Sequence, residues 1–267
     1  MNTKELLMRD KYHGHADAGS LENDLMRIAA GEPIDYVIGW KPFCGIEADL
    51  SLQPLIPREE TEYWVGECIS DVRSRTSDGQ KSDFRYTFRC LDMCTGSGCI
   101  AAALLKAFPL ASCDCVDNDP QMLKAVWLTM ERNSISPERY RLIESDIWEH
   151  VEGVYDLICA NPPYVGEQEE VGEGVREYEP AQAVFAGDAG RAALSKFFEG
   201  LEEHLAEGGP PVPNGTFERG LAYCEFSPMQ EAWVQEHLTT LACQGKICRD
   251  QYGRARFLRM GKRVLYA

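Results

Sequence analysis

A regular alternation of strand-like and helix-like segments after residue 88 is the feature that most constrains the fold of this chain. Short apolar runs of strand length alternate with longer stretches that have helical spacing. Strands are predicted at 89–94, 111–116, 140–144, 154–160, 221–226, 244–250 and 255–260, and helices at 98–108, 120–133, 189–206 and 228–240. This alternation is typical of right-handed βαβ units, so we predict an α/β fold with a parallel sheet and a ligand crevice at the carboxyl ends of its strands.

The residues before this pattern are predicted to form two smaller parts. A polar helical segment at 1–30 carries a thin apolar stripe, and Gly31-Glu32-Pro33 ends it. A β-hairpin within 37–55 and a helix at 59–75 follow, and the polar loop 76–83 marks a boundary. We therefore predict a short N-terminal helical segment (1–30), a β-hairpin with a linker helix (31–83) and a main domain (84–267).

The charge and hydropathy of the chain argue against DNA and membranes as partners. The chain has 27 Lys and Arg against 43 Asp and Glu, a net charge of −16, which repels phosphate backbones and disfavours bulk DNA binding. No apolar run reaches the length of a membrane span, and the N-terminus has no export or transit pattern. A soluble intracellular protein is expected, with the cytoplasm favoured by the N-terminus.

Cysteine and histidine usage argues against a disulfide framework and against a metal site. The chain has eleven cysteines, an odd number, and most lie in apolar strand-like runs, so reduced core thiols are expected. Cys90, Cys94 and Cys99 have neither paired spacing nor a nearby histidine, and no Cys-x-x-Cys occurs. The five histidines are scattered, which favours surface positions for them. We predict no metal site.

A glycine-containing loop after the first strand of the main domain predicts a nucleotide-type cofactor. The segment Asp92-Met-Cys-Thr95-Gly96-Ser-Gly98 leaves a strand and enters a helix, where glycines let the backbone approach a ligand. Asp117 ends the next strand, where a carboxylate can accept the hydroxyl groups of a ribose. Asp146 follows the third strand and is placed to accept from an adenine amino group.

The most informative motif is Asn161-Pro162-Pro163-Tyr164, which directly follows a strand. Two consecutive prolines remove two N–H donors, so nearby carbonyl groups have fewer local partners. The carboxamide of Asn161 offers an acceptor beside these carbonyls, and the ring of Tyr164 offers a flat face for a planar amide or base. Such a motif can hold an NH₂ group. Proline pairs also end strands, so the motif alone leaves a purely structural interpretation open.

Together these segments resemble the HemK-type glutamine N5-methyltransferases of peptide chain release factors, a class I S-adenosylmethionine (AdoMet) family. The resemblance spans residues 31–267. The matching segments are Gly31-Glu32-Pro33 with Gly39, Pro57-Arg58 with Glu60-Thr61-Glu62, the Asp92 loop, Asp117, Asp146, Asn161-Pro162-Pro163-Tyr164, Arg176 with Tyr178-Glu179-Pro180, Gly187 with Gly190, Glu225 with Gln230, and Gly253-Arg254.

The resemblance implies a seven-stranded, mostly parallel Rossmann-like sheet with an antiparallel last strand, AdoMet as methyl donor, and no metal. It implies transfer to the glutamine side-chain nitrogen of a Gly-Gly-Gln motif in a release factor, the expected protein partner, with no membrane partner and at most indirect nucleic-acid contact. Eukaryotic relatives leave the mitochondrial matrix open as a location. The implied catalytic residues are Asn161, Pro162 and Tyr164; the implied cofactor contacts are Asp92, Thr95, Gly96, Gly98, Asp117, Asp146, Ile147 and Asn161; the implied substrate rim is Arg58, Thr61 and Pro163.

Several positions depart from the family pattern. Cys94 replaces a loop glycine, so this position must either take a negative φ or bear a strain of about 1 kcal/mol. Glu59 and Ser227 replace a usual Pro and Gly, residues 210–220 form an insertion, and the N-terminal helical segment is short. An acidic stretch at 167–179 is read as solvated charge, whereas the basic residues after 245 stay open between a solvated hairpin and a contact surface.

Three hypotheses follow. The first is protein glutamine methylation, the second is methylation of a nucleic-acid amino group at adenine N6 or guanine N2, and the third is an AdoMet-binding protein without catalysis. The net charge and the lack of a recognisable DNA-binding module weigh against the second. The intact motif at Asn161 weighs against the third.

Overall fold

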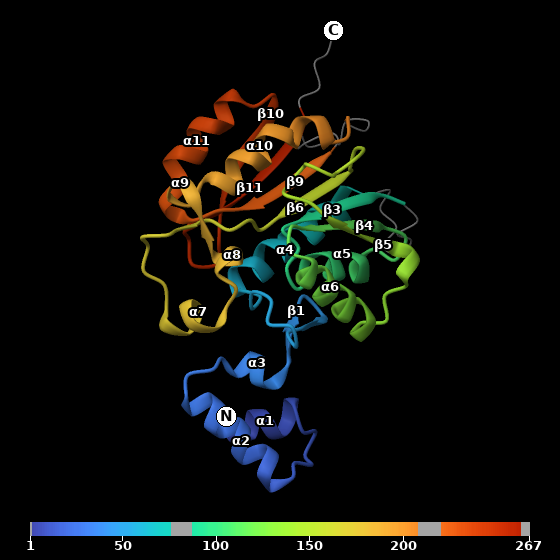
Figure 1. The fold of residues 1–267 in the computed structure, drawn as a ribbon. Helices are drawn as coiled ribbons and strands as arrows, with labels where there is room; N and C mark the ends of the chain where they lie inside the picture. Colours follow the sequence, from blue (N-terminus) through green and yellow to red (C-terminus); the bar gives the residue numbers. More distant parts are fainter. Residues whose placement is uncertain (1, 76–86, 208–219, 263–267) are drawn as a thin grey trace.

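The computed structural model describes residues 2–75, 87–207 and 220–262 (Figure 1). A seven-stranded sheet in the order β10-β11-β9-β6-β3-β4-β5 forms its centre. The strands are β3 (Arg89–Met93), β4 (Ser112–Asp117), β5 (Tyr140–Glu144), β6 (Leu157–Ala160), β9 (Leu221–Glu225), β10 (Cys243–Arg249) and β11 (Ala255–Lys262). Pairs among β5, β4, β3, β6 and β9 are parallel, whereas β11 runs antiparallel to both β9 and β10. The predicted mostly parallel sheet with an antiparallel last strand is therefore confirmed.

Helices cover both faces of the sheet, and the two faces bury alternate residues of the strands, as period-2 side-chain geometry requires. On one face Cys90, Cys159 and Tyr223 pack against α4 (Glu59–Arg75), α5 (Cys99–Ala107) and α6 (Pro120–Arg132). On the other face Leu91 and Ile158 pack against α10 (Ala192–His204) and α11 (Glu231–Thr240). The five predicted helices of this region are therefore confirmed, with ends that differ by a few residues.

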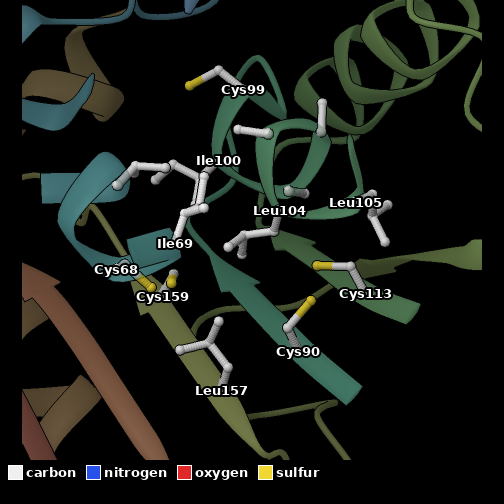
Figure 2. Packing of buried hydrophobic residues seen from close by; sticks show 14 of the residues in the cluster. Cys68, Ile69, Cys90, Cys99, Ile100, Leu104, Leu105, Cys113, Leu157 and Cys159 are labelled. Atoms are coloured by element: carbon white, nitrogen blue, oxygen red, sulfur yellow. The ribbon is translucent and has the colours of Figure 1, made fainter. Parts of the chain in front are cut away.

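Thiols fill much of the first core (Figure 2). The side chains of Cys68 and Cys159 meet between α4 and β6, and those of Cys90 and Cys113 lie on the neighbouring strands β3 and β4 beneath α5. All eleven cysteines are free, and most are buried. A buried thiol packs like a small apolar side chain, so these residues serve the core as the sequence pattern indicated.

The N-terminal part contains the predicted helices and hairpin, and one helix that was not predicted. Helices α1 (Thr3–Asp10) and α2 (Ala18–Ala29) lie at the end of the molecule farthest from α10 and α11 (Figure 1). The short helix α3 (Ile34–Ile38) ends at Gly39, which has a left-handed φ of 92°. The hairpin follows as β1 (Trp40–Phe43) and β2 (Ile46–Asp49).

The hairpin and α4 share a core with the sheet. Phe43, Ile46 and Ala48 belong to the same buried cluster as Trp64 and the residues of α5. The backbone N–H of Asp49 also donates to Thr129 Oγ1 on α6 at 2.9 Å. The division of the chain at residues 30 and 83 stays a prediction, and the loop predicted at 76–83 and nearly all of the insertion at 210–220 lie outside the described residues.

A run of short elements between β6 and α10 was not predicted. It comprises β7 (Val165–Gly166), α7 (Glu173–Tyr178), α8 (Ala181–Val184), β8 (Phe185–Ala186) and the turn-like α9 (Gly187–Gly190), and β7 pairs with β8 in parallel. Two 3₁₀ turns, η1 (Pro137–Arg139) and η2 (Pro228–Gln230), complete the elements. Gly190 has a φ of 83°, and a Cβ there would lie 2.2 Å from the carbonyl oxygen of Tyr164. This glycine therefore lets the chain pass closely behind the Asn-Pro-Pro-Tyr motif.

None of the helices in the described segments combines the length and the apolar character needed to cross a bilayer.

Candidate functional site

The loop that follows β3 is organised by the buried carboxylate of Asp92. Its Oδ2 accepts hydrogen bonds from Thr95 Oγ1 at 2.7 Å and from the backbone N–H of Ala101 at 3.1 Å, which ties the loop to the start of α5. Its Oδ1 is buried and has no hydrogen-bond partner among the described residues. Burial raises the pKa of this carboxyl to about 7. Asp92 therefore supports the loop from the interior of the protein.

Three residues of this loop have left-handed backbone conformations. Gly96 and Gly98 have φ values of 53° and 75°, and Cys94 has a φ of 58°. Of the two alternatives for Cys94, the structure thus shows the strained one. A Cβ on Gly98 would lie 2.9 Å from Val126 Cγ1 and 3.1 Å from its Cα, so Gly98 allows α5 to pack closely on α6.

Asp117 closes β4 and connects it to the loop. Its Oδ2 accepts from the backbone N–H of Gly96 at 2.9 Å, and its Oδ1 accepts from the backbone N–H of Asp119 at 3.1 Å. Desolvation raises the pKa of the Asp117 carboxyl. The carboxylate is partly exposed and keeps lone pairs for a further donor.

The segment after β5 supplies a third polar edge. Asp146 is half-exposed and pairs with Lys196 Nζ of α10 at 2.5 Å. Ile147 has a φ of 54°, which is an outlier for a β-branched residue, and Ser145 Oγ donates to its carbonyl at 3.0 Å. Strained backbone of this kind is concentrated at ligand sites.

The Asn-Pro-Pro-Tyr motif stands at the carboxyl end of β6, beside β3. The carboxamide of Asn161 donates through Nδ2 to Thr61 Oγ1 at 3.2 Å, and the hydroxyl of Tyr164 donates to Glu225 Oε1 at 2.8 Å. Within the described parts of the chain, neither Oδ1 of Asn161 nor the carbonyl oxygen of Pro162 receives a hydrogen bond. The motif therefore presents two acceptors that are not used by the fold.

Two cavities meet at this motif. We call the first the loop cavity because it lies against the loop after β3; its walls include Met93, Cys94, Asn118, Met122, Pro180 and Gln182. We call the second the lip cavity; its walls include Glu60, Val165, Val171, Val175, Val184 and Arg254. Both are lined by Leu55, Arg58, Asn161 and Ala183. Asn161 therefore stands at the boundary between a cavity whose walls include the carboxylates of Asp117 and Asp146 and a valine-rich one.

The residues that the sequence nominated are distributed over both cavities. The loop cavity is lined by Arg58, Thr61, Thr95, Gly96, Asp117, Asp146, Ile147, Asn161 and Pro163. The lip cavity is lined by Arg58, Asn161, Pro162 and Tyr164. Asp92 and Gly98 line neither one, because both act within the loop and its packing on α6.

Glu225 carries part of the family resemblance, but the sequence predicted no role for it in the site. It ends β9, is fully buried, and accepts from Thr61 Oγ1 and Trp64 Nε1 at 2.7 Å each and from Tyr164. Burial raises the pKa of the Glu225 carboxyl, and the nearby Arg256 acts in the opposite direction. The available signal was an acid that closes the otherwise apolar strand Leu221–Glu225.

The buried Glu179 joins the residues just before α4 to the segment between β6 and α10. Glu179 accepts from Arg58 Nη2 at 2.7 Å and from the backbone N–H of Ile56 at 3.1 Å. Because Arg58 lines both cavities, this ion pair fixes a wall that the two cavities share. The acidic stretch at 167–179, which the sequence predicts to be solvated charge, is therefore not all solvated, because Glu179 is buried and bonded within the fold.

Three of the seven basic residues after 245 form ion pairs with acids of the described chain. Arg256 pairs with the buried Asp250 at 3.2 Å, Arg259 pairs with Asp71, and Arg249 lies 3.7 Å from Glu231. The buried Arg256 and the nearly buried Arg259 therefore serve the fold, whereas Lys246, Arg249 and Arg254 are exposed at the surface.

Comparison with known proteins shows that this chain is similar to methyltransferases. Residues 81–178 match the family described as Methyltransferase small domain. The chain is 35% identical over 211 residues to the release factor glutamine methyltransferase of Koribacter versatilis, a match covering 78% of this chain and 69% of that protein. It is 32% identical over 187 residues to the enzyme of that name from Rhodopirellula baltica, covering 68% of this chain and 61% of that protein, less than two thirds of its length.

Among solved structures, a methyltransferase from Pyrococcus furiosus has the same fold. It superposes with a TM-score of 0.54 at 17% identity and covers 90% of this chain and 97% of its own. At this identity the likeness speaks for the fold alone.

Proposed function

Because this chain belongs to the release factor glutamine methyltransferase family, we propose that it transfers a methyl group from AdoMet to the side-chain amide nitrogen of the glutamine in the Gly-Gly-Gln motif of a release factor. The observation that carries this proposal is the position of Asn161. Its side chain lies where the loop cavity and the lip cavity meet, and its amide oxygen and the neighbouring Pro162 carbonyl accept no hydrogen bond from the described chain.

The residues of the loop cavity fit AdoMet, which supplies a methyl group activated on a sulfonium sulfur. Asp117 keeps acceptor capacity for ribose hydroxyl groups, and Asp146 and the strained backbone of Ile147 form the edge suited to a base. Asp92 lines neither cavity, so its part is to hold the loop that carries Thr95 and Gly96 against the cofactor. Gly96 has open space where a Cβ would stand, so a ligand can approach its backbone.

The lip cavity fits the side chain of a glutamine. Its valines suit the apolar stem, and the two unused acceptors suit the two protons of the terminal NH₂ group. An amide nitrogen is a poor nucleophile because its lone pair is delocalised. Held by Asn161 Oδ1 and the Pro162 carbonyl, the nitrogen is kept in one orientation with its lone pair facing the loop cavity. In the transfer, the bond from this nitrogen to the methyl carbon would form as that carbon's bond to sulfur breaks, and the proton lost from the nitrogen would pass to water.

This function is tested by incubating the recombinant chain with AdoMet and a release factor, followed by peptide mass spectrometry. We expect one added methyl group on the glutamine of the Gly-Gly-Gln motif, and no labelling of DNA or RNA offered in parallel. Labelling of nucleic acid without labelling of the release factor would overturn the proposal. AdoMet binding without transfer to either substrate would show that catalysis has been lost.

Asp117→Ala is expected to weaken AdoMet binding by about 1–3 kcal/mol, because the variant removes a charged acceptor for ribose hydroxyl groups and releases the N–H of Gly96. Titration calorimetry measures the change. Asp156→Ala is the matched control, since Asp156 also accepts a backbone hydrogen bond, at 2.9 Å from Arg89, but stands outside both cavities. Equal affinities for Asp117→Ala and wild type would remove Asp117 from the cofactor site.

Cys94→Gly is expected to keep or raise methyl-transfer activity, because glycine adopts the left-handed conformation of position 94 without a steric penalty. Cys94→Ala separates the two properties of the residue, since it removes the thiol and keeps the strain. Initial rates at saturating AdoMet and thermal unfolding midpoints give the comparison. A large loss of activity in both variants, with normal folding, would show that the thiol itself takes part.

A further inference from the structure

Four side chains from distant parts of the sequence form one hydrogen-bonded network behind the lip cavity. Trp64 Nε1 and Thr61 Oγ1, both on α4, donate to the same oxygen of Glu225 at 2.7 Å. Asn161 Nδ2 then donates to Thr61 Oγ1 at 3.2 Å. Trp64 and Glu225 are fully buried, and Thr61 is 2% exposed. Water therefore has little access to the network, and its protons must be shared among these groups.

The donors and acceptors available in these groups fix the direction of each hydrogen bond in the network. An indole N–H can only donate, so Oε2 of Glu225 must act as an acceptor toward Trp64. The single hydroxyl proton of Thr61 points to that same oxygen, which leaves only lone pairs on Thr61 Oγ1. The group that Asn161 turns toward Thr61 must then be its NH₂. In the reverse orientation, the amide oxygen of Asn161 would face the lone pairs of Thr61.

We infer that Glu225 and Thr61 are positioning residues that set the orientation of the Asn161 carboxamide, with its oxygen directed away from Thr61 and available to the NH₂ group of the substrate. The inference rests on the proposed function, because an amide substrate requires an acceptor at this point. If the carboxamide of Asn161 were reversed, its NH₂ group would face the NH₂ group of the substrate, and neither could accept a hydrogen bond. The direction of the network therefore decides whether the site binds an amide nitrogen productively.

The second oxygen of Glu225 supports the same arrangement. It accepts from the hydroxyl of Tyr164 at 2.8 Å, so one buried carboxylate fixes both Asn161, through Thr61, and the ring of Tyr164. Desolvation and the neighbouring Glu225 raise the pKa of the Tyr164 hydroxyl well above its usual range, which keeps this group a donor. Both ends of the Asn-Pro-Pro-Tyr motif are thus oriented from the end of β9.

The test uses Thr61→Val, which keeps the shape of the side chain and removes its hydroxyl, and Thr61→Ser, which restores the hydroxyl. We expect Thr61→Val to lower kcat for methylation of a release factor by about tenfold or more, because the NH₂ of Asn161 then turns toward the open cavity; AdoMet affinity is measured alongside, since Thr61 lines the loop cavity. Thr61→Ser should recover most of this loss. The matched control is Thr129→Val, because Thr129 is also fully buried and its Oγ1 accepts a hydrogen bond at 2.9 Å, yet it lies outside both cavities.

A second measurement needs no substrate. The side-chain amide resonances of Asn161, identified by their absence in Asn161→Ala, should exchange with solvent more slowly in wild type and Thr61→Ser than in Thr61→Val. If these differences appear while the wild-type chain methylates no release factor, the proposed function fails and the orientation of Asn161 stands. If the wild-type chain methylates a release factor and Thr61→Val matches it in kcat or in amide exchange, the positioning role is overturned.

Discussion

Asn161→Ala is expected to lower methyl transfer to a release factor by at least about 100-fold while leaving AdoMet affinity within about twofold of wild type. The variant removes the amide oxygen that holds the substrate NH₂ group, whereas Asp117 and Asp146, the two carboxylates that line the loop cavity, stay in place. Single-turnover transfer measures the first quantity, and titration calorimetry measures the second.

Asn133→Ala provides the comparison for this variant. Unlike that of Asn161, the carboxamide of Asn133 is fully engaged: it donates at 2.8 Å to the carbonyls of Glu47 and Thr129 and accepts from the backbone N–H of Glu47 at 2.9 Å, so it serves only the junction of α6 with the hairpin. Its loss should lower stability and leave transfer intact. If Asn161→Ala retained wild-type transfer, the acceptor role of the motif would have to be abandoned.

Gly190→Ala is expected to lower the free energy of unfolding by at least about 2 kcal/mol and to reduce methyl transfer as well. The residue has a φ of 83°, which an alanine tolerates poorly, and the new Cβ would lie 2.2 Å from the carbonyl oxygen of Tyr164 and 2.9 Å from Gln230 Nε2. These are the two groups that hydrogen-bond to each other at 3.1 Å behind the motif. Relief of the clash must therefore displace the backbone that carries Tyr164. Denaturant unfolding and transfer rates measure the two effects.

Gly253→Ala separates backbone strain from the clash. Gly253 has a similar φ of 77°, but no atom lies within 4 Å of the position its Cβ would take. This control should lose only the backbone contribution, about 1 kcal/mol. Equal destabilisation of the two variants would mean that the segment around Gly190 moves aside freely.

The sequence predicted the sheet and its covering helices well because both carry their own periodic patterns. Strands β3, β4 and β6 are short, mainly buried runs, and helix α6 begins with the N-cap Asp119 followed by Pro120, so each can be recognised locally. Helix α3 and the elements from β7 to α9 are shorter than the periods that reveal a helix or strand. The conformation of α9 depends on the close approach of Gly190 to the backbone of Tyr164.

The sequence predicted the site residues that belong to a local motif. It did not predict those whose role depends on residues far away in the chain. The glycine loop, Asp117 and Asn161 stand directly after strands, and strand ends meet at one edge of a parallel sheet. Glu225 also ends a strand, but its role depends on its donors Thr61 and Trp64, which lie 164 and 161 positions earlier in the chain. The left-handed φ of Ile147 was equally hidden, because an isoleucine is not expected to adopt it.

The two unused acceptors beside the lip cavity also limit the stoichiometry of the proposed reaction. Asn161 Oδ1 and the Pro162 carbonyl together match an amide nitrogen that carries two protons. A singly methylated amide carries one, so it leaves one of the two acceptors unpaired and binds less well than the unmodified side chain. The same pair of oxygens that favours the first transfer thus favours departure of the product, and the modification ends at a single methyl group.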